Sequence, residues 1–200
     1  MYPKYKQIIL ASRNQGKIRE LKNLLGDSWS VVGLDDPDFS EFTGEIEETG
    51  TTFRENALIK ARAVHQQCGG FVLADDSGIE CDDLEGAPGV YSARFAGPKA
   101  TDEQNNAKLV ELLQAAQDPN LRARYVCVLA LINPVGEEFV VEETCEGIIN
   151  FEPKGSGGFG YDPYFYLPDY SCTMAELPLE EKNKISHRGK ALRKIAHLLE

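Results

Sequence analysis

Two adjacent carboxylates, Asp75 and Asp76, follow the apolar run 71–74 and precede Ser77 and Gly78. Open α/β sheets place ligands at the carboxyl ends of strands, so carboxylates directly after a buried strand favour a site there. One of them can bind Mg²⁺ while it or its neighbour orients a water molecule or accepts its proton. The alternative is a turn in which the Asp side chains cap backbone groups and Gly78 takes a positive φ.

A second candidate site is the segment 12–17, SRNQGK, between a predicted strand and a predicted helix. It is not a Walker motif, because Ala11 stands where the first glycine belongs and Ile18 replaces the metal-binding Ser or Thr. Backbone N–H groups at a helix start and the Lys17 ammonium would still favour a phosphate. The alternative is a solvated lysine on a helix surface.

Two C-terminal segments combine aromatic and polar side chains. In GGFGYDP, residues 157–163, Phe159 is suited to stack on a base and Asp162 to read its edge, unless the segment is a tight turn with core aromatics. The overlapping residues 155–160, GSGGFG, match the GxGxxG dinucleotide-binding pattern, but a β-like run follows where a helix is required, which excludes a Rossmann site. The segment 186–189, SHRG, offers donors for a purine oxygen or a phosphate, although His187 also suits a surface or capping role.

The charged residues are segregated along the chain. Residues 35–48 hold seven acids and 75–85 hold six, both without a base, whereas 182–194 hold six bases and no acid. A metal-bound triphosphate needs hard oxygen ligands for Mg²⁺ and cations for the remaining phosphate oxygens, and these blocks supply both. The alternative is that they are solvated faces that keep the protein soluble.

Hydrophobic patterning predicts alternating strands and helices. Strands are expected over 6–11, 30–34, 71–74 and 164–167, and helices over 17–25, 52–68 and 101–116. Residues 122–132 and 138–149 predict an antiparallel hairpin, and 179–200 a helical segment interrupted near Ser186 and Gly189. The remaining long segment, 75–99, is predicted to be a functional loop. The pattern indicates one compact α/β unit with one or two lobes.

Composition limits the class of protein. The 200 residues are 42% hydrophobic with a net charge of −11, which excludes a disordered chain and disfavours general binding to nucleic acid or to a membrane surface. An apolar run of about 20 residues and a signal-peptide pattern are both missing, so we expect a soluble cytoplasmic protein. The five cysteines are widely spaced and contain no CxxC pair, which argues against a disulfide framework or a zinc cluster.

Taken together and in order, five segments closely resemble the inosine triphosphate pyrophosphatase (Ham1-like) family: SRNQGKIREL, EETGTTFRENALIKA, ADDSGIECDDLEGAPGVYSARFAG, GFGYDPYF and TMAELPLEEKNKISHRGKAL. The match extends from Ile8 to Leu192. This resemblance implies a homodimeric, Mg²⁺-dependent enzyme that hydrolyses aberrant purine nucleoside triphosphates, namely ITP, dITP and XTP, to the monophosphate and pyrophosphate. It also implies one domain over residues 1–200, with two lobes around a long mixed β-sheet, flanking helices and a central nucleotide cleft.

The resemblance also implies roles for individual residues. Glu47 and Asp76 match the magnesium ligands, and Asp76 matches the proton acceptor. The matching substrate contacts are Ser12, Arg13, Asn14, Gln15, Gly16, Lys17, Lys60, Ser77, Phe159, Gly160, Tyr161, Asp162, Lys182, His187 and Arg188. Within this set Lys17 and Lys60 face the phosphates, and Lys182, His187 and Arg188 face the 6-oxo purine and the neighbouring phosphate. Ser12 and Arg13 depart from the Thr and Gly that are frequent in the family, which affects fine tuning only.

Three alternatives remain at this point. A nucleotide sensor would keep the pocket without turnover, although both implied metal carboxylates and Asp75 are present. A pyrophosphatase of the Maf-like relatives would catalyse the same reaction on modified pyrimidine or methylated nucleotides, and only base preference would distinguish it. A purely structural interaction protein would leave the segregated charges without a role.

Overall fold

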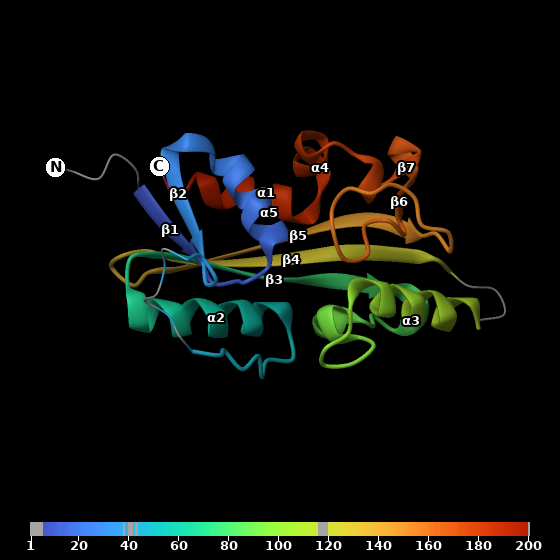
Figure 1. Ribbon diagram of the computed structural model, residues 1–200, viewed down its shortest axis with the longest axis horizontal. Coiled ribbons are helices and arrows are strands. Elements are labelled where there is room, and N and C mark those ends of the chain that lie inside the picture. Colours follow the sequence, from blue (N-terminus) through green and yellow to red (C-terminus); the bar gives the residue numbers. More distant parts are fainter. Residues whose placement is uncertain (1–5, 38, 40–41, 43, 116–119, 200) are drawn as a thin grey trace. The chain divides into compact units, whose positions relative to one another are not determined.

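The computed structural model describes residues 6–37, 39, 42, 44–115 and 120–199, which form an α/β fold (Figure 1). Its sheet has the strand order β2-β1-β3-β4-β5-β6-β7. The strands are β1 (Lys6–Leu10), β2 (Trp29–Gly33), β3 (Phe71–Cys81), β4 (Arg122–Ile132), β5 (Glu138–Ile149), β6 (Phe165–Leu167) and β7 (Cys172–Thr173). The α-helices are α1 (Gln15–Leu25), α2 (Phe53–Cys68), α3 (Asp102–Gln114), α4 (Leu179–Ile185) and α5 (His187–Ala196). Short 3₁₀ helices cover Gly26–Ser28, Asp82–Leu84, Gly89–Arg94, Pro168–Tyr170 and Met174–Glu176.

The sheet is mixed, as the sequence predicts. Strand β1 pairs in parallel with β2 and with β3, placing Ile9 opposite both Val32 and Val72. Strand β6 pairs antiparallel with β5 and β7. Parallel strands need a crossover connection, and α1 supplies it between β1 and β2. The predicted α/β class with flanking helices is confirmed.

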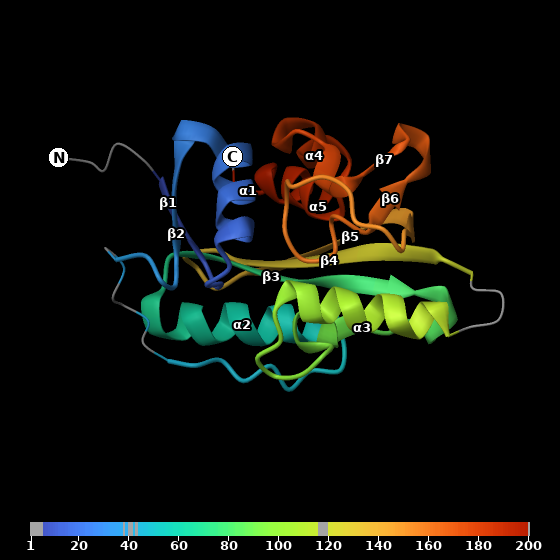
Figure 2. The same ribbon diagram turned by 45° about the vertical axis from the view of Figure 1, so that its right-hand side comes forward.

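The fold divides into two compact units, each with its own core. The first unit consists of the described residues within 1–76, 127–143 and 188–200, and the second of those within 77–126 and 144–187. In the first unit α1 and α5 lie on one face of the strands and α2 on the other (Figures 1 and 2). Its core includes Ile8, Leu21, Leu73, Leu129 and Leu192. In the second unit α3 lies on one face of the strands, and the core includes Ile79, Leu109, Leu113, Ile149 and Phe165.

Side-chain caps explain where the first three helices begin. The Asn14 side chain accepts a hydrogen bond from the Lys17 N–H and starts α1. Capping boxes start α2 and α3, with Thr52 and Thr101 as the N-cap residues. These caps confirm the predicted helix starts to within two residues. The predicted end of the third helix, Ala116, lies outside the described residues.

Strand β3 differs from the prediction. Instead of ending at Ala74 and entering a loop, it continues to Cys81, so Asp75 and Asp76 are strand residues and Gly78 is not in a turn. The parallel pairing with β1 nevertheless covers only Phe71–Leu73 of β3. The two carboxylates therefore lie just beyond the carboxyl end of β1, where ligands of parallel sheets bind.

The C-terminal helical segment breaks once, at Ser186, where α4 ends. The second predicted interruption is wrong, because Gly189 lies inside α5. Glycine in a helix interior costs about 1 kcal/mol relative to alanine. Burial of Ala191, Leu192 and Ile195 in the first core offsets this cost. The predicted last residue, Glu200, is outside the described part of the chain.

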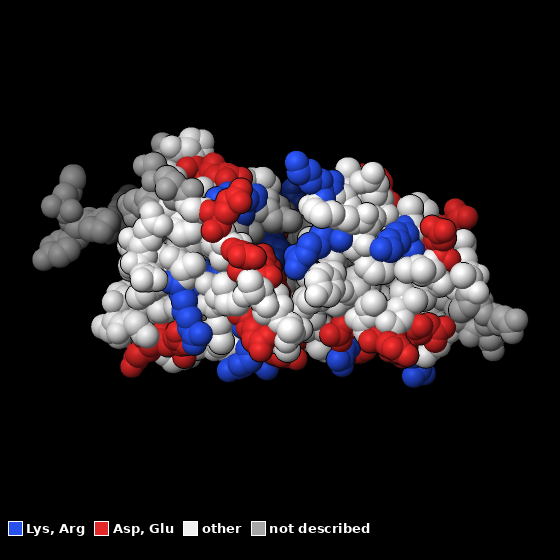
Figure 3. Space-filling view, turned by 90° about the horizontal axis from the view of Figure 1, so that it is seen from below, with Lys and Arg blue, Asp and Glu red and all other residues white. Residues whose placement is uncertain are grey.

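The surface is charged and mixed. In the face shown in Figure 3, acidic and basic side chains are interspersed and form no extended basic patch. Within the described residues, the helices are all too short or too polar to cross a membrane. The five cysteines are free thiols, and Cys81, Cys127 and Cys145 are buried.

Candidate functional site

Asp75 is a buried carboxylate whose two oxygens are both bound by cations of the first unit. Its Oδ1 accepts a hydrogen bond from Lys17 Nζ at 2.5 Å, and its Oδ2 accepts one from Arg188 Nε at 2.6 Å. The Cys127 thiol donates a weaker bond to Oδ2 at 3.6 Å. Burial by itself raises the pKa of Asp75, but the charges of Arg188 and Lys17 outweigh it and hold the pKa well below its ordinary value. Asp75 is therefore ionised and fully engaged.

This pKa shift predicts how the stability of the protein depends on pH. A carboxyl whose pKa is depressed by folding stabilises the folded state above its unfolded pKa, about 4, and loses that contribution as the pH falls through the folded pKa. We expect the difference in free energy of unfolding between wild type and Asp75→Asn to be constant above about pH 5 and to shrink below about pH 4. Urea titrations at several pH values measure it. A difference that grows on acidification would contradict the assigned ionisation.

Arg188 and Glu20 extend this buried network. Arg188 Nη1 donates to Glu20 Oε2 at 2.6 Å, and both side chains are almost fully buried. Two carboxylates of the first unit thus bind the Nε and Nη1 of Arg188, and its contact with the purine or the neighbouring phosphate stays a prediction. Sequence reasoning missed Glu20. The sequence pattern that could have indicated Glu20 is an acidic residue next to Leu21 on the apolar side of a predicted helix. An unpaired charge there would be too costly, so a buried cation had to be expected nearby.

Asp76 differs from its neighbour because only one of its oxygens has a partner. Its Oδ1 accepts a hydrogen bond from Lys60 Nζ at 2.6 Å, whereas its buried Oδ2 has none. Burial raises the pKa of Asp76 above its ordinary value, although the nearby Lys60 charge opposes the shift. A buried carboxylate oxygen without a donor can accept a proton or ligate a cation. This orphaned atom fits the magnesium-ligand and proton-acceptor roles that the family resemblance implies for Asp76.

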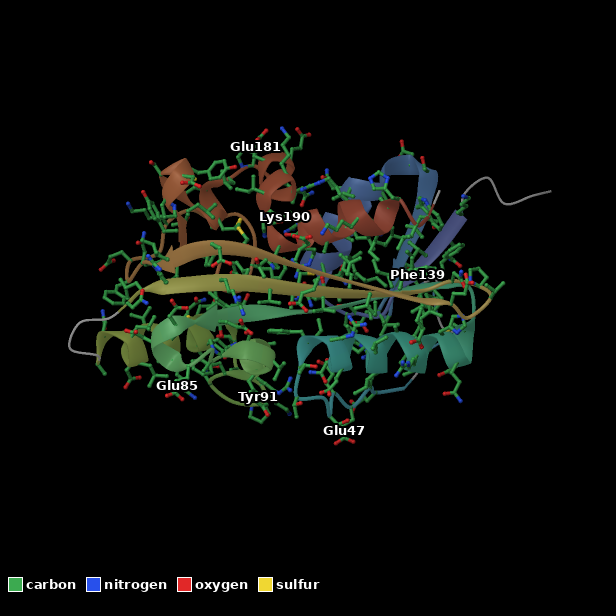
Figure 4. All side chains as sticks on the ribbon, turned by 180° about the vertical axis from the view of Figure 1, so that it is seen from behind. Glu47, Glu85, Tyr91, Phe139, Glu181 and Lys190 are labelled. Atoms are coloured by element: carbon green, nitrogen blue, oxygen red, sulfur yellow. The ribbon has the colours of Figure 1, made fainter. Side chains whose placement is uncertain are left out.

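A second carboxylate beside this cluster is Glu48, whereas the role of the neighbouring Glu47 as a magnesium ligand stays a prediction. Glu48 Oε2 lies 3.4 Å from Lys60 Nζ, and its negative charge contributes to the raised pKa of Asp76. Glu47 is exposed, and Figure 4 shows its side chain pointing outward, away from α2. Among the described residues, no three His, Cys, Asp or Glu side chains form a complete metal cage.

The loop before α1 uses its polar groups locally. Ser12 Oγ accepts a hydrogen bond from the Asn14 N–H at 3.1 Å, and Asn14 Oδ1 accepts one from the Lys17 N–H at 3.1 Å. Gln15 is exposed and Gly16 half-buried at the first turn of the helix. The helix start is thus formed as predicted, with the Lys17 N–H bonded to its own cap and the Lys17 ammonium directed to Asp75.

Arg13 takes part in a surface contact. Its Nε lies 2.9 Å from Asp35 Oδ1, and its Nη2 donates to the Gly44 carbonyl at 3.0 Å. Both charged side chains are about half exposed, so this ion pair contributes little to stability. The contact ties the loop before α1 to the acidic segment, of which Asp38 and Glu41 lie outside the described residues.

The second unit contains a cluster around the buried carboxylate of Asp162. Its Oδ2 accepts hydrogen bonds from Lys182 Nζ at 2.6 Å and from the Phe159 N–H at 2.9 Å. Its Oδ1 accepts one from the Tyr125 hydroxyl at 3.1 Å. Protein donors bind both of its oxygens, and the role of Asp162 in reading a base edge stays a prediction. Asp162 and Lys182 form a buried ion pair.

An aromatic surface accompanies this carboxylate. Lys182 Nζ lies 4.9 Å from the centroid of the Phe159 ring, and the His187 ring stacks on Tyr125 with centroids 4.5 Å apart. Sequence reasoning placed Phe159, Lys182 and His187 at one site, and the structure brings them together around Asp162. It missed Tyr125, because a tyrosine in the apolar strand β4 looks like a core residue.

Gly160 and Tyr161, the other predicted substrate contacts within residues 159–162, shape the loop. Gly160 has φ +62°, and its N–H donates to Asp102 Oδ2 at 2.7 Å. The buried Tyr161 hydroxyl donates to the Ser92 carbonyl at 2.8 Å, which gives it a structural role. Gly158 also has a positive φ, and a Cβ there would overlap the Asp162 carboxylate. These glycines explain why the segment needs a permissive backbone. Ser77, the other predicted contact, is a half-buried residue of β3.

These clusters define an α/β protein with a buried lysine–carboxylate site in one unit and a lysine–aromatic site in the other. Residues 8–198 match the model of the Ham1 family, and the chain belongs to that family. It is 50% identical over 194 residues to a dITP/XTP pyrophosphatase of Desulforamulus reducens, covering 96% of this chain and 95% of that protein. A dITP/XTP pyrophosphatase of Bacillus subtilis is 47% identical, with 98% of both chains covered. The solved HAM1 protein of Coxiella burnetii is 45% identical with a TM-score of 0.85, covering 97% of this chain and 98% of that one.

Proposed function

We propose that this chain is a Mg²⁺-dependent nucleoside triphosphate pyrophosphatase that hydrolyses ITP, dITP and XTP to the monophosphate and pyrophosphate. This activity removes aberrant purine nucleotides from the nucleotide pool. The observation that carries the proposal is Asp76, a buried carboxylate with one oxygen bound by Lys60 and the other without a hydrogen-bond partner. The similarity to dITP/XTP pyrophosphatases of Desulforamulus reducens and Bacillus subtilis supports the same reaction.

The first unit supplies groups for the triphosphate. The Lys60 ammonium lies 2.6 Å from Asp76 and, with Lys17, offsets the negative charge of the phosphates and of the leaving pyrophosphate. Asp76 and Glu47 are the carboxylates that would hold Mg²⁺, with Glu48, 3.4 Å from Lys60 Nζ, close enough to contribute. When bound, this ion supplies charge neutralisation and lowers the pKa of a coordinated water molecule. In phosphoryl transfer, positioning and charge stabilisation provide most of the acceleration.

Proton handling falls to Asp76 rather than to Asp75. Asp76 Oδ2 accepts the proton of the water that attacks the α-phosphorus, because this oxygen has no other donor. Asp75 is unsuited to this role, because its oxygens are bound by Lys17 and Arg188 and its pKa is depressed.

The second unit supplies groups for the base. A 6-oxo purine presents an acceptor where adenine presents an amino donor, so a donor such as Lys182 or His187 pairs with inosine and mismatches adenine. A buried polar group left unpaired costs about 1–3 kcal/mol, equivalent to roughly tenfold to a hundredfold in affinity. Selection against ATP follows from this pairing. Selection against GTP requires a further contact at the 2-position.

Phe159 is proposed to stack on the base, and its removal is expected to weaken substrate binding. Stacking contributes about 1–3 kcal/mol, so Phe159→Ala should raise the KM for ITP by roughly tenfold or more, with a smaller change in kcat. Steady-state kinetics measures the change in KM. Phe151→Ala is the control, because it removes an aromatic side chain at another half-buried site. An unchanged KM for ITP in Phe159→Ala would show that the stacking assignment is wrong.

The proposed reaction is tested by pyrophosphate release from ITP, dITP, XTP, ATP, GTP and dUTP, with Mg²⁺ and with a chelator. Mg²⁺-dependent release from the first three substrates is the expected result. Binding of ITP without release from any of them would indicate a nucleotide sensor. Turnover of dUTP or of another modified nucleotide in preference to ITP would indicate a Maf-like specificity.

We further propose that residues 1–200 act as one catalytic domain and that the protein is a cytoplasmic homodimer. The family match over residues 8–198 supports the single domain. The homodimer follows from the family resemblance, and light scattering after size-exclusion chromatography tests it. A monomer at micromolar concentration would contradict it.

A further inference from the structure

Tyr125 lies at the centre of the second unit's polar cluster, and its contacts reach three of the residues proposed to bind the base. Its hydroxyl donates to Asp162 Oδ1 at 3.1 Å, inside the unit. Its ring stacks on His187 with an interplanar angle of 10° and packs against Phe165 with centroids 4.4 Å apart. Through Asp162 it is one contact away from Lys182.

The buried carboxylate of Asp162 needs hydrogen-bond donors at both of its oxygens. It and Lys182 are almost fully buried, and a buried ion pair is stable only when the remaining lone pairs are satisfied. The Phe159 N–H and Lys182 Nζ bind Oδ2, and the Tyr125 hydroxyl binds Oδ1. Without that hydroxyl the carboxylate would keep its donors at Oδ2 but lose the contact at Oδ1 that restricts its rotation, and with it the position of Lys182.

We propose that Tyr125 is a positioning residue that determines the selectivity of the base site. Its hydroxyl fixes the carboxylate of Asp162, which directs the Lys182 ammonium, and its ring fixes the plane of His187. Tyr125 thus holds two separate hydrogen-bond donors in the geometry that matches a 6-oxo purine. This inference rests on the proposed function for the identity of the ligand. The contacts of Tyr125 from which it is argued all lie within one unit.

A purely structural role for Tyr125 would predict a different outcome. Loss of core packing weakens the binding of every nucleotide to a similar degree. Loss of orientation at Lys182 and His187 selectively weakens the binding of nucleotides whose 6-position accepts a hydrogen bond from the protein. The ratio of affinities for ITP and ATP therefore separates the two roles.

The test is equilibrium binding of ITP and of ATP in the presence of a chelator, which prevents turnover. Tyr125→Phe keeps the ring and removes only the hydroxyl, and Tyr166→Phe, a half-buried tyrosine of β6, is the matched control. We expect Tyr125→Phe to lose about tenfold in affinity for ITP and less than twofold for ATP. The control should keep the wild-type ratio. Equal weakening of both nucleotides, or no change, would overturn the proposal.

Two further variants test the route of the effect. If Tyr125 acts through Asp162, the double variant Tyr125→Phe with Asp162→Asn should lose little more selectivity for ITP over ATP than Asp162→Asn alone. Additive losses in the double variant would contradict that route. Tyr125→Leu also removes the ring that contacts His187, so it should lose more selectivity than Tyr125→Phe. Circular dichroism and thermal unfolding establish that each variant folds.

The outcome of this test is separable from that of the proposed reaction. Selective binding of ITP that depends on Tyr125, in a wild-type protein that releases no pyrophosphate, would refute the reaction and support the positioning role. Pyrophosphate release that is selective for ITP and unaffected by Tyr125→Phe would support the reaction and refute the positioning role. A wild-type protein that binds ITP no better than ATP would refute both.

Discussion

Replacement of Asp76 by Asn is expected to reduce kcat for ITP by about 100-fold or more while leaving the protein folded. The amide keeps the size of the side chain and one oxygen for Lys60, but it cannot accept a proton at the position of the unpartnered Oδ2. It is also a weaker ligand for a hard cation than a carboxylate. Single-turnover measurements at saturating ITP and Mg²⁺ report the effect on the chemical step.

The control for this prediction is Asp27→Asn, an exposed aspartate in the same unit. It removes one negative charge without touching the site, and it should keep kcat within about twofold of wild type. Near-normal turnover of Asp76→Asn would transfer the proton-accepting role to Asp75 and refute the assignment made from the orphaned oxygen.

Replacement of Asp75 by Asn is expected to act mainly on stability. Removing one partner of a buried ion pair costs about 3–5 kcal/mol, because the remaining charges stay buried without compensation. Here Arg188 would lose one of its two carboxylate contacts at 2.6 Å, and Lys17 would lose its contact with the Asp75 carboxylate. For a protein of this size, such a loss corresponds to a Tm lower by roughly 10 °C. Urea unfolding and thermal scans measure the loss.

A double-mutant cycle provides the control for Asp75. Replacing Arg188 by Met together with Asp75→Asn removes the charges on both sides of the 2.6 Å contact. The double variant should be less destabilised than the sum of the two single variants. If Asp75→Asn unfolds like wild type yet loses kcat by two orders of magnitude, the carboxylate is catalytic and its structural assignment is wrong.

Sequence patterns predicted most elements because their signals are local. The cap of α2 at Thr52, the apolar faces of the helices and the turn between β4 and β5 depend on residues within a few positions of one another. The length of β3 depended on tertiary contacts instead. Asp75 and Asp76 are turn formers by residue type, but buried cations far away in the sequence hold them inside a strand.

The structure adds partners to the predicted site residues. Residue types pointed to Lys17, Asp76 and Phe159, the family resemblance added Lys60 and Lys182, and the structure places each beside a partner of suitable chemistry. It also shows contacts that the sequence did not indicate: Arg188 with Asp75, Asp162 with Lys182, and Glu48 with Lys60. Side-chain direction in irregular segments and pairing across distant segments leave no periodic signal, so only the structure reveals them.

The most direct test of the proposed reaction is hydrolysis of ITP in ¹⁸O-labelled water, with mass analysis of both products. Attack on the α-phosphorus with Asp76 as proton acceptor predicts one ¹⁸O atom in inosine monophosphate and none in pyrophosphate. The same labelling should persist, at a rate about 100-fold lower, in Asp76→Asn. Label in the pyrophosphate, or release of labelled inorganic phosphate with inosine diphosphate, would contradict the proposed pyrophosphatase.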